Sequence, residues 1–280
     1  MAEMLRDLPG VAIYLDDILV SGATLQKHLE NLQRLLERLK SKGLRWRKSK
    51  CLFAQPQVEY LGHVLSNSGI AKSSKVDAVL QMPPPTDVQS LRSILGSVQF
   101  YAKFLPPNTS TIAAPLYKLT HSNTKWTWGK KENEAFLQLK ALLTSDSVLV
   151  HFNPALLLGI ACDASNVGIG ATLFHRYEDE SERPIANVSK ILTKSQANYS
   201  QVQKEAFAII FALKKFYQFL YGRKFILVTN HKPLLSLFGP TKGVPILAVN
   251  RLARWALFLS NFDYEIEFRN SRLPSGTMCF

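Results

Sequence analysis

Apolar positions recur with two different periods along this chain, and these periods predict its elements. Between residues 24 and 42 leucines recur every three or four positions, which predicts an amphipathic helix that ends at Gly43. Residues 44–70 alternate with the period of strands. A helical pattern returns after Asp87, which is a favourable N-cap, and stops at Pro106 because proline cannot continue a helix. We expect the aromatic residues at the end of this pattern to be core rather than base-stacking groups: Phe100, Tyr101 and Phe104.

The second half of the chain shows strands followed by a helix and a further strand. An apolar strand, 156–163, ends in the carboxylate of Asp163, and 168–174 is its expected hairpin partner. A helix that opens near Tyr199 carries Glu205 in its early turns, and the strand Lys224–Thr229 leads into Asn230. We therefore predict a mixed α/β fold whose second half is a mixed sheet flanked by helices.

Two adjacent carboxylates lie inside an apolar, strand-forming stretch. Residues 13–20 predict a tight hairpin with Asp16 and Asp17 at its tip. Charges among apolar residues are costly unless a cation or hydrogen-bond donors satisfy them, and a divalent metal is the usual partner of clustered carboxylates. An ordinary Asp-Asp turn is the alternative, since Asp is a favoured turn residue.

The charge of the chain favours a polyanionic partner. Its 34 Lys and Arg against 21 Asp and Glu give a formal net charge of +13, which favours nucleic acid over a membrane surface. The densest basic run lies between Lys40 and Lys50, and we expect the cations to contact phosphates and the indole to stack: Arg45, Trp46, Arg47, Lys48 and Lys50. A solvated helix end explains the same run equally well.

Cysteine usage and the N-terminus indicate the compartment. The three cysteines lie far apart without a C-x-x-C pair, so we expect neither a disulfide framework nor a zinc site. Residues 1–10 carry acids and a Pro-Gly turn rather than a signal sequence, and the apolar stretch 206–220 is too short to span a bilayer. We expect an intracellular protein, cytoplasmic or nuclear, that binds no membrane; the oligomeric state is left open.

Several motifs in a fixed order link the chain to a known family. The stretch Y-L-D-D-I-L-V at 14–20 is followed by Gly43-Leu44, by K-C-L-F at 50–53 and by V-E-Y-L-G-H at 58–63. In this order the motifs resemble the polymerase region of gypsy-type long-terminal-repeat retrotransposons, and the resemblance extends nearly to Arg269.

The resemblance implies four parts in an α+β or mixed α/β architecture. They are the C-terminal part of a reverse-transcriptase palm (1–70), a thumb (71–120), a connection (121–153) and a C-terminally truncated ribonuclease H-like domain (154–280). Tyr60, Leu61 and Gly62 correspond to the strand pair that holds the primer end. Asp16 is the implied metal ligand of the polymerase site and Asp17 its supporter, while a further aspartate would lie before Met1.

In the ribonuclease H part, the family cleaves the RNA of a hybrid with two divalent ions, Mg²⁺ or Mn²⁺. Asp163 matches the first acid and Glu205 the second, and both are implied metal ligands. The third position is Asn230, where the family has Asp. The fourth acid would lie beyond Arg269, and the tail 270–280 lacks it.

We therefore expect a retrotransposon RNA-directed DNA polymerase fragment that binds RNA–DNA hybrid or duplex nucleic acid and is catalytically defective by itself. Two alternatives are a weakly active, metal-dependent ribonuclease H and a non-catalytic nucleic-acid-binding or interaction module. A third is a chain that does not fold stably.

Overall fold

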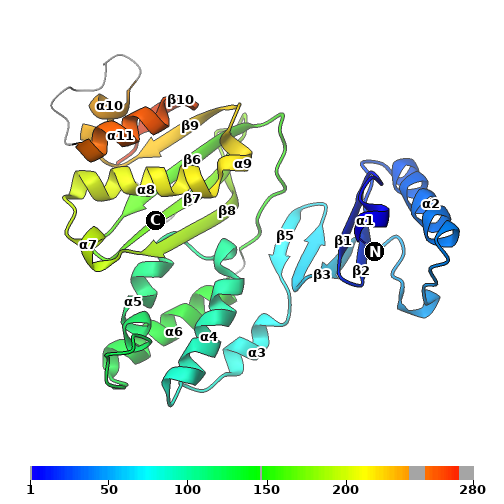
Figure 1. Ribbon diagram of the computed structural model, residues 1–280, viewed down its shortest axis with the longest axis horizontal. Coiled ribbons are helices and arrows are strands. Elements are labelled where there is room, and N and C mark those ends of the chain that lie inside the picture. The colour runs from blue at the N-terminus through cyan, green and yellow to red at the C-terminus, as the bar shows by residue number, and fades with distance from the viewer. Residues whose placement is uncertain (1, 146, 240–249, 271–280) are drawn as a thin grey trace. The chain divides into compact units, whose positions relative to one another are not determined.

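The computed structural model describes residues 2–145, 147–239 and 250–270, and the chain divides into two compact units, Met1–Asn67 and Ser68–Phe280 (Figure 1). The prediction about the tail after Asn270 lies outside the described residues.

The first unit packs a hairpin against one amphipathic helix. Leu35 and Leu39 of the helix are buried together with Leu5, as its leucine spacing predicts. The helix ends in a Schellman motif, in which Leu44 N–H donates to Leu39 O and Gly43 lies in the left-handed region at φ 70°. The unit has these elements: α1 (Ala2–Leu5), β1 (Val11–Tyr14), β2 (Asp17–Val20), α2 (Leu25–Ser41), the 3₁₀ turn η1 (Lys48–Lys50), β3 (Gln57–Tyr60) and β4 (His63–Ser66).

The predicted helix and hairpin of this unit are confirmed, but strands over all of 44–70 are wrong. Strand structure begins only at Gln57, and the basic run before it forms η1 and loop. The polarity of that run alternates, but its charged side chains are all exposed to solvent, so the run has no buried face of the kind that a strand in a sheet has.

The second unit begins with a strand and a group of helices around one apolar core. Asp87 caps α4, as predicted, in a capping box with Ser90, and α3 ends before the prolines at 83–85. Tyr101 and Phe104 are buried, whereas Phe100 is 52% exposed, so the core prediction is wrong for Phe100. The elements are β5 (Gly69–Lys72), α3 (Val76–Gln81), α4 (Val88–Phe100), η2 (Ala102–Phe104), α5 (Thr109–Leu119) and α6 (Lys130–Thr144).

A five-stranded mixed sheet follows in the order β10-β9-β6-β7-β8 (Figure 1). The pairs β10–β9 and β9–β6 are parallel, and the pairs β6–β7 and β7–β8 are antiparallel. Its strands are β6 (Leu157–Ala164), β7 (Gly168–Arg176), β8 (Glu182–Ile191), β9 (Lys224–Thr229) and β10 (Asp263–Phe268). Its helices are α7 (Lys194–Ala197), α8 (Gln201–Lys215), α9 (Tyr217–Leu220), α10 (Pro233–Phe238) and α11 (Asn250–Leu259). The apolar side of α8 packs on β6 and β7 in the main core. The predicted mixed α/β fold is confirmed, although the sequence pattern had not indicated β8, α11 or β10.

Contacts fix the helical group to this sheet. The hydroxyls of Thr111 and Ser165 are 2.8 Å apart, and Asn187 Nδ2 donates to Lys103 O at 3.1 Å. Gly170 of β7 lies so close to the Pro107 carbonyl that a Cβ at this position would collide with it. Ser165 follows Asp163 by two residues, so α5 supports the loop that ends β6.

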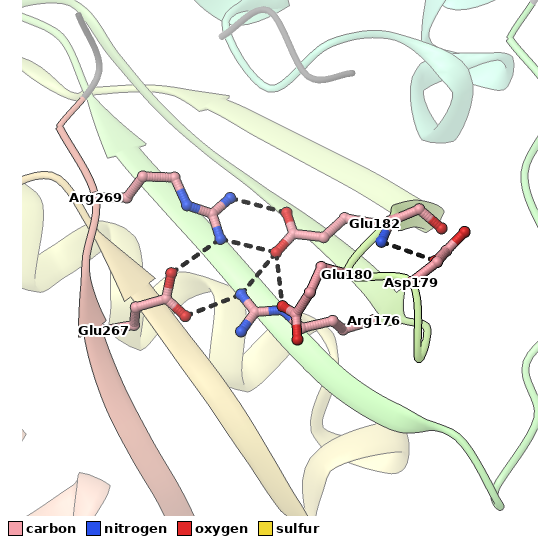
Figure 2. A network of polar contacts seen from close by, with 7 residues as sticks. Arg176, Asp179, Glu180, Glu182, Glu267 and Arg269 are labelled. Carbon is pink, nitrogen blue, oxygen red and sulfur yellow. Dashed lines mark hydrogen bonds and ion pairs between the residues drawn. The ribbon is translucent and has the colours of Figure 1, made fainter. Parts of the chain in front are cut away.

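Four charged side chains connect the two edges of the sheet (Figure 2). Glu182 of β8 accepts hydrogen bonds from Arg176 of β7 and from Arg269, both as short as 2.7–2.8 Å. Glu267 of β10 binds the same two arginines at 2.9 and 3.0 Å. Burial raises the pKa of Glu182, but the hydrogen bonds from both arginines outweigh it and hold that pKa below its ordinary value. The network therefore ties the edge strand β10 to the β7–β8 hairpin.

Candidate nucleic-acid and metal sites

Asp16 and Asp17 lie at the turn of the β1–β2 hairpin. The predicted tight hairpin is present, but its tip is shifted by one residue: Tyr14 pairs with Asp17, so Leu15 and Asp16 form the two-residue loop and Asp17 begins β2. Leu15 has φ 51°, a conformation that non-glycine residues rarely adopt. Both carboxylates are exposed. The hairpin thus presents two acids to solvent on a tight turn.

A second tight hairpin carries Tyr60, Leu61 and Gly62. Tyr60 pairs with His63, and Leu61 and Gly62 have φ 51° and 73°, the φ signs of a type I′ turn. Burial raises the pKa of Tyr60, and the negative charge of Asp17 raises it further. Asp17 and the end of β3 are therefore electrostatic neighbours within this unit.

The basic run that follows α2 is open to solvent. Its members are exposed over η1 and the preceding loop, and Trp46 is 46% exposed: Arg45, Trp46, Arg47, Lys48 and Lys50. Because α2 already ends at Ser41, the residues from Arg45 to Lys50 form a loop and the turn η1 rather than the solvated end of that helix.

In the second unit, Asp163 and Asn230 meet at the ends of two neighbouring strands. The parallel strands β6 and β9 pair Cys162 with Thr229, which places the next residue of each side by side. Asn230 Nδ2 donates to Asp163 Oδ1 at 2.9 Å. The amide therefore uses its hydrogen-bond donor, not its oxygen, toward the carboxylate.

Glu205 reaches the same end of the sheet from α8. A capping box between Ser200 and Gln203 starts this helix, and Glu205 is only 4% exposed. Gln201 Nε2 donates to Glu205 Oε1 at 2.8 Å and to Ala164 O at 3.1 Å. Burial raises the pKa of Glu205 to about 7; the hydrogen bond from Gln201 opposes this shift, and the charge of Asp163 adds to it.

Sequence reasoning missed Gln201, although a signal was present. Gln201 precedes Glu205 by four residues, and residues four apart face each other on a helix. Cys162, also at this end of β6, is buried, and its burial and the charges of Glu205 and Asp163 raise the pKa of its thiol.

These donors do not fit a centre for two divalent ions. Within residues 2–145, 147–239 and 250–270, no three acidic, histidine or cysteine side chains gather as a metal-binding group. Each carboxylate of the pair instead accepts a hydrogen bond from a neutral amide: Asp163 from Asn230 and Glu205 from Gln201. Two hard cations held side by side require more negative charge than two carboxylates supply.

Comparison with known proteins agrees with this architecture. A family model described as reverse transcriptase (RNA-dependent DNA polymerase) matches residues 1–65, and one described as the RNase H-like domain found in reverse transcriptase matches residues 128–227. The transposon Tf2-3 and Tf2-7 polyproteins of Schizosaccharomyces pombe are each 34% identical over 262 residues. The match covers 92% of this chain and 19% of each polyprotein.

Solved structures show the same fold. The foamy viral protease-reverse transcriptase dRH in complex with ds DNA has a TM-score of 0.79 at 21% identity, over 96% of this chain and 47% of that chain. The foamy viral protease-reverse transcriptase in complex with RNA/DNA hybrid has a TM-score of 0.76 at 22% identity, over 98% of this chain and 37% of that chain.

The mixed sheet, with α8 against it and Asp163 at a strand end, defines a ribonuclease H-like domain that follows a reverse-transcriptase segment. The chain thus carries a reverse-transcriptase segment at residues 1–65 and an RNase H-like domain at residues 128–227, and it is homologous to a part of retrotransposon polyproteins. Its predicted resemblance is therefore confirmed. Both families generally depend on divalent metal ions. In the part of the chain that the structure describes, no helix has both the length and the apolarity to cross a membrane.

Proposed function

We propose that this chain is a nucleic-acid-binding part of a retrotransposon reverse transcriptase whose ribonuclease H-like site is impaired in cleavage. The single observation that carries the proposal is the hydrogen bond from Asn230 to Asp163, at the place where the family has a third acid. An amide brings no negative charge, and its N–H group occupies a carboxylate lone pair that a metal ion would use. The site therefore attracts Mg²⁺ or Mn²⁺ weakly.

The expected partner is an RNA–DNA hybrid or a duplex. The net charge of +13 and the exposed run after α2 support phosphate contacts by Arg45, Arg47, Lys48 and Lys50, with Trp46 as a stacking group. The foamy viral protein of the same fold is described in complex with ds DNA and with RNA/DNA hybrid, which also supports this class of partner.

We assign the polymerase side of the function to the two hairpins of the first unit. In this proposal Asp16 is the metal ligand, Asp17 supports it, and the turn at Tyr60, Leu61 and Gly62 contacts the primer end. The pKa of Tyr60, which is raised by burial and further by the charge of Asp17, supports this assignment.

A weakly active ribonuclease H is the second candidate, because Asp163 and the buried Glu205 still lie close enough to shift a pKa. One labelled RNA–DNA hybrid tests both candidates, with binding followed by anisotropy and cleavage by gel in Mg²⁺ and in Mn²⁺. We expect binding without appreciable cleavage. Metal-dependent cleavage that disappears in Asp163→Asn would instead establish the second candidate, and absence of any binding would refute the proposal.

A further inference from the structure

Two tyrosines of the second unit form an open aromatic stack. The rings of Tyr217 and Tyr221 have centroids 4.8 Å apart and an interplanar angle of 21°. Their exposed fractions are 45% and 55%, which is unusual for a packed aromatic pair. Phe262, which is buried, meets both rings edge-on at 6.0 and 6.2 Å and supports them from the core side. The pair thus packs against the core through Phe262 on one side and is open to solvent on the other.

This stack is separate from the Asp163 site. Tyr217 opens α9, and Tyr221 lies just before the start of β9 at Lys224, whereas Asn230 follows the end of that strand. Lys224 and Thr229, the two ends of β9, are five residues apart, which corresponds to roughly 17 Å along the strand. Figure 1 accordingly shows α9 at the end of the sheet where β9 begins.

Three cations are close to the stack in the sequence. Lys214 and Lys215 precede it in the last turn of α8 and are exposed, and Arg223 follows it, with its guanidinium over the Phe152 ring and a hydrogen bond to Phe219 O. Lys214 Nζ lies 5.7 Å from the Phe258 ring, which in turn contacts Phe262 at 5.5 Å, so this lysine belongs to the same aromatic cluster.

The nearby carboxylates do not cancel this charge. Glu265 pairs with Lys224 at 2.6 Å, and Asp263 starts the neighbouring strand. Four cations against two carboxylates leave this surface positive. A positive surface with open aromatic faces has the two features that sequence-tolerant binding of single strands requires.

We propose that Tyr217 and Tyr221 form a second nucleic-acid site, which binds a single strand by stacking its bases while Lys214, Lys215 and Arg223 contact the phosphates. This inference rests on the nucleic-acid binding proposed above and adds to it a place and a strand type. A single strand fits because its bases offer free faces, whereas the bases of a duplex are already stacked on one another. Phe262 by itself covers the core at this place, so packing of the core does not explain why two half-exposed tyrosine rings lie next to it.

The test uses the full chain and a fluorescent oligothymidylate of about eight nucleotides. The double variant Tyr217→Leu, Tyr221→Leu should bind on the order of tenfold more weakly, because stacking contributes that much or more per base. Tyr217→Phe with Tyr221→Phe should bind like the parent, since it retains both rings. Leu257→Ala on α11, a 66% exposed apolar side chain without a ring, is the matched control and should change nothing.

Photocrosslinking of the parent protein with an iodouracil-containing oligonucleotide should label the peptide that holds both tyrosines, and this readout does not depend on the folding of any variant. The proposal is overturned if the leucine double variant is folded and binds like the parent, if the phenylalanine variant loses as much affinity as the leucine variant, or if the crosslinks map only elsewhere. If the parent protein binds the hybrid and one of these results is found, only the proposed single-strand site is refuted. If the parent protein binds neither the hybrid nor the single strand, the proposed function itself is refuted.

Discussion

Asn230 donates a hydrogen bond of 2.9 Å from its side-chain nitrogen to the carboxylate of Asp163. The two residues are 67 positions apart in the chain and are brought together by the parallel pairing of β6 and β9. An aspartate at position 230 would place a second negative charge at this distance, and only a cation or a proton could then stabilise the pair. The identity of this one residue therefore decides how strongly the site attracts metal.

Metal should become a stabilising ligand when the amide is replaced. In EDTA, Asn230→Asp loses a hydrogen bond to a charged group and gains repulsion, so we expect it to be about 1–3 kcal/mol less stable than the parent. Added Mg²⁺ or Mn²⁺ should restore this stability, because it binds only the folded state. Thermal unfolding with and without metal measures the effect, and Asn198→Asp at an exposed position is the control. Equal metal response in both variants would contradict this account.

The same substitution should not give strong cleavage of a hybrid. Asp163, Glu205 and an aspartate in place of Asn230 can hold one divalent ion well, but cleavage by this fold uses two ions, one on each side of the reacting phosphate. We expect turnover in Asn230→Asp to remain far below that of an intact family member. Rates typical of the family, abolished by Glu205→Gln, would show that three acids suffice.

Glu205 should make the stability of the chain depend on pH. Its pKa is raised from 4.5 to about 7, so its contribution to stability is fully present below pH 4.5 and is lost as the pH rises through about 7. Urea unfolding in EDTA should show a loss on the order of 2–3 kcal/mol between pH 5 and pH 8 that is missing in Glu205→Gln. Glu178→Gln, at an exposed position, should retain the parent pH profile. Superimposable profiles for the parent and Glu205→Gln would rule out the raised pKa.

The network in Figure 2 should respond to acid in the opposite sense. The pKa of Glu182 is lowered, so its contribution is present above the unfolded value near 4.5 and is lost as the pH falls through the folded value. Glu182→Gln leaves the partly buried Arg176 and Arg269 to share Glu267, with only the exposed Glu180 also near Arg176, and should cost about 2–4 kcal/mol at pH 7. Glu180→Gln is the matched control, because Glu180 lies 4.0 Å from Arg176 but is 83% exposed. If both variants lose the same stability, the burial of Glu182 has no special role.

Hybrid binding should depend steeply on salt, in part through the run after α2. Replacing Arg45, Arg47 and Lys48 by Gln removes up to three phosphate contacts, so the slope of log affinity against log salt should fall by about 2–3. The matched control replaces Lys125, Lys130 and Lys131, which are also exposed, by Gln. An equal effect of both triple variants would mean that only net charge matters.

Local features of this chain followed from the sequence alone. The Asp16 turn, the Gly43 end of α2 and the Asp87 capping box depend on residues within a few positions of one another, so period, turn and cap signals were sufficient. The ordered motifs also indicated the family, which the comparisons confirm.

Tertiary structure decided what these residues contact. No pattern shows that Asn230 donates to Asp163, because that contact depends on the register of β6 and β9, which are separated in the chain by two strands and three helices. The edge strand β10 likewise was not predicted, since the fold alone brings its Glu267 to Arg176 and Arg269 and its Glu265 to Lys224. Short-range preferences fix elements, whereas the free energy of a buried charge depends on partners that only the folded chain brings within reach.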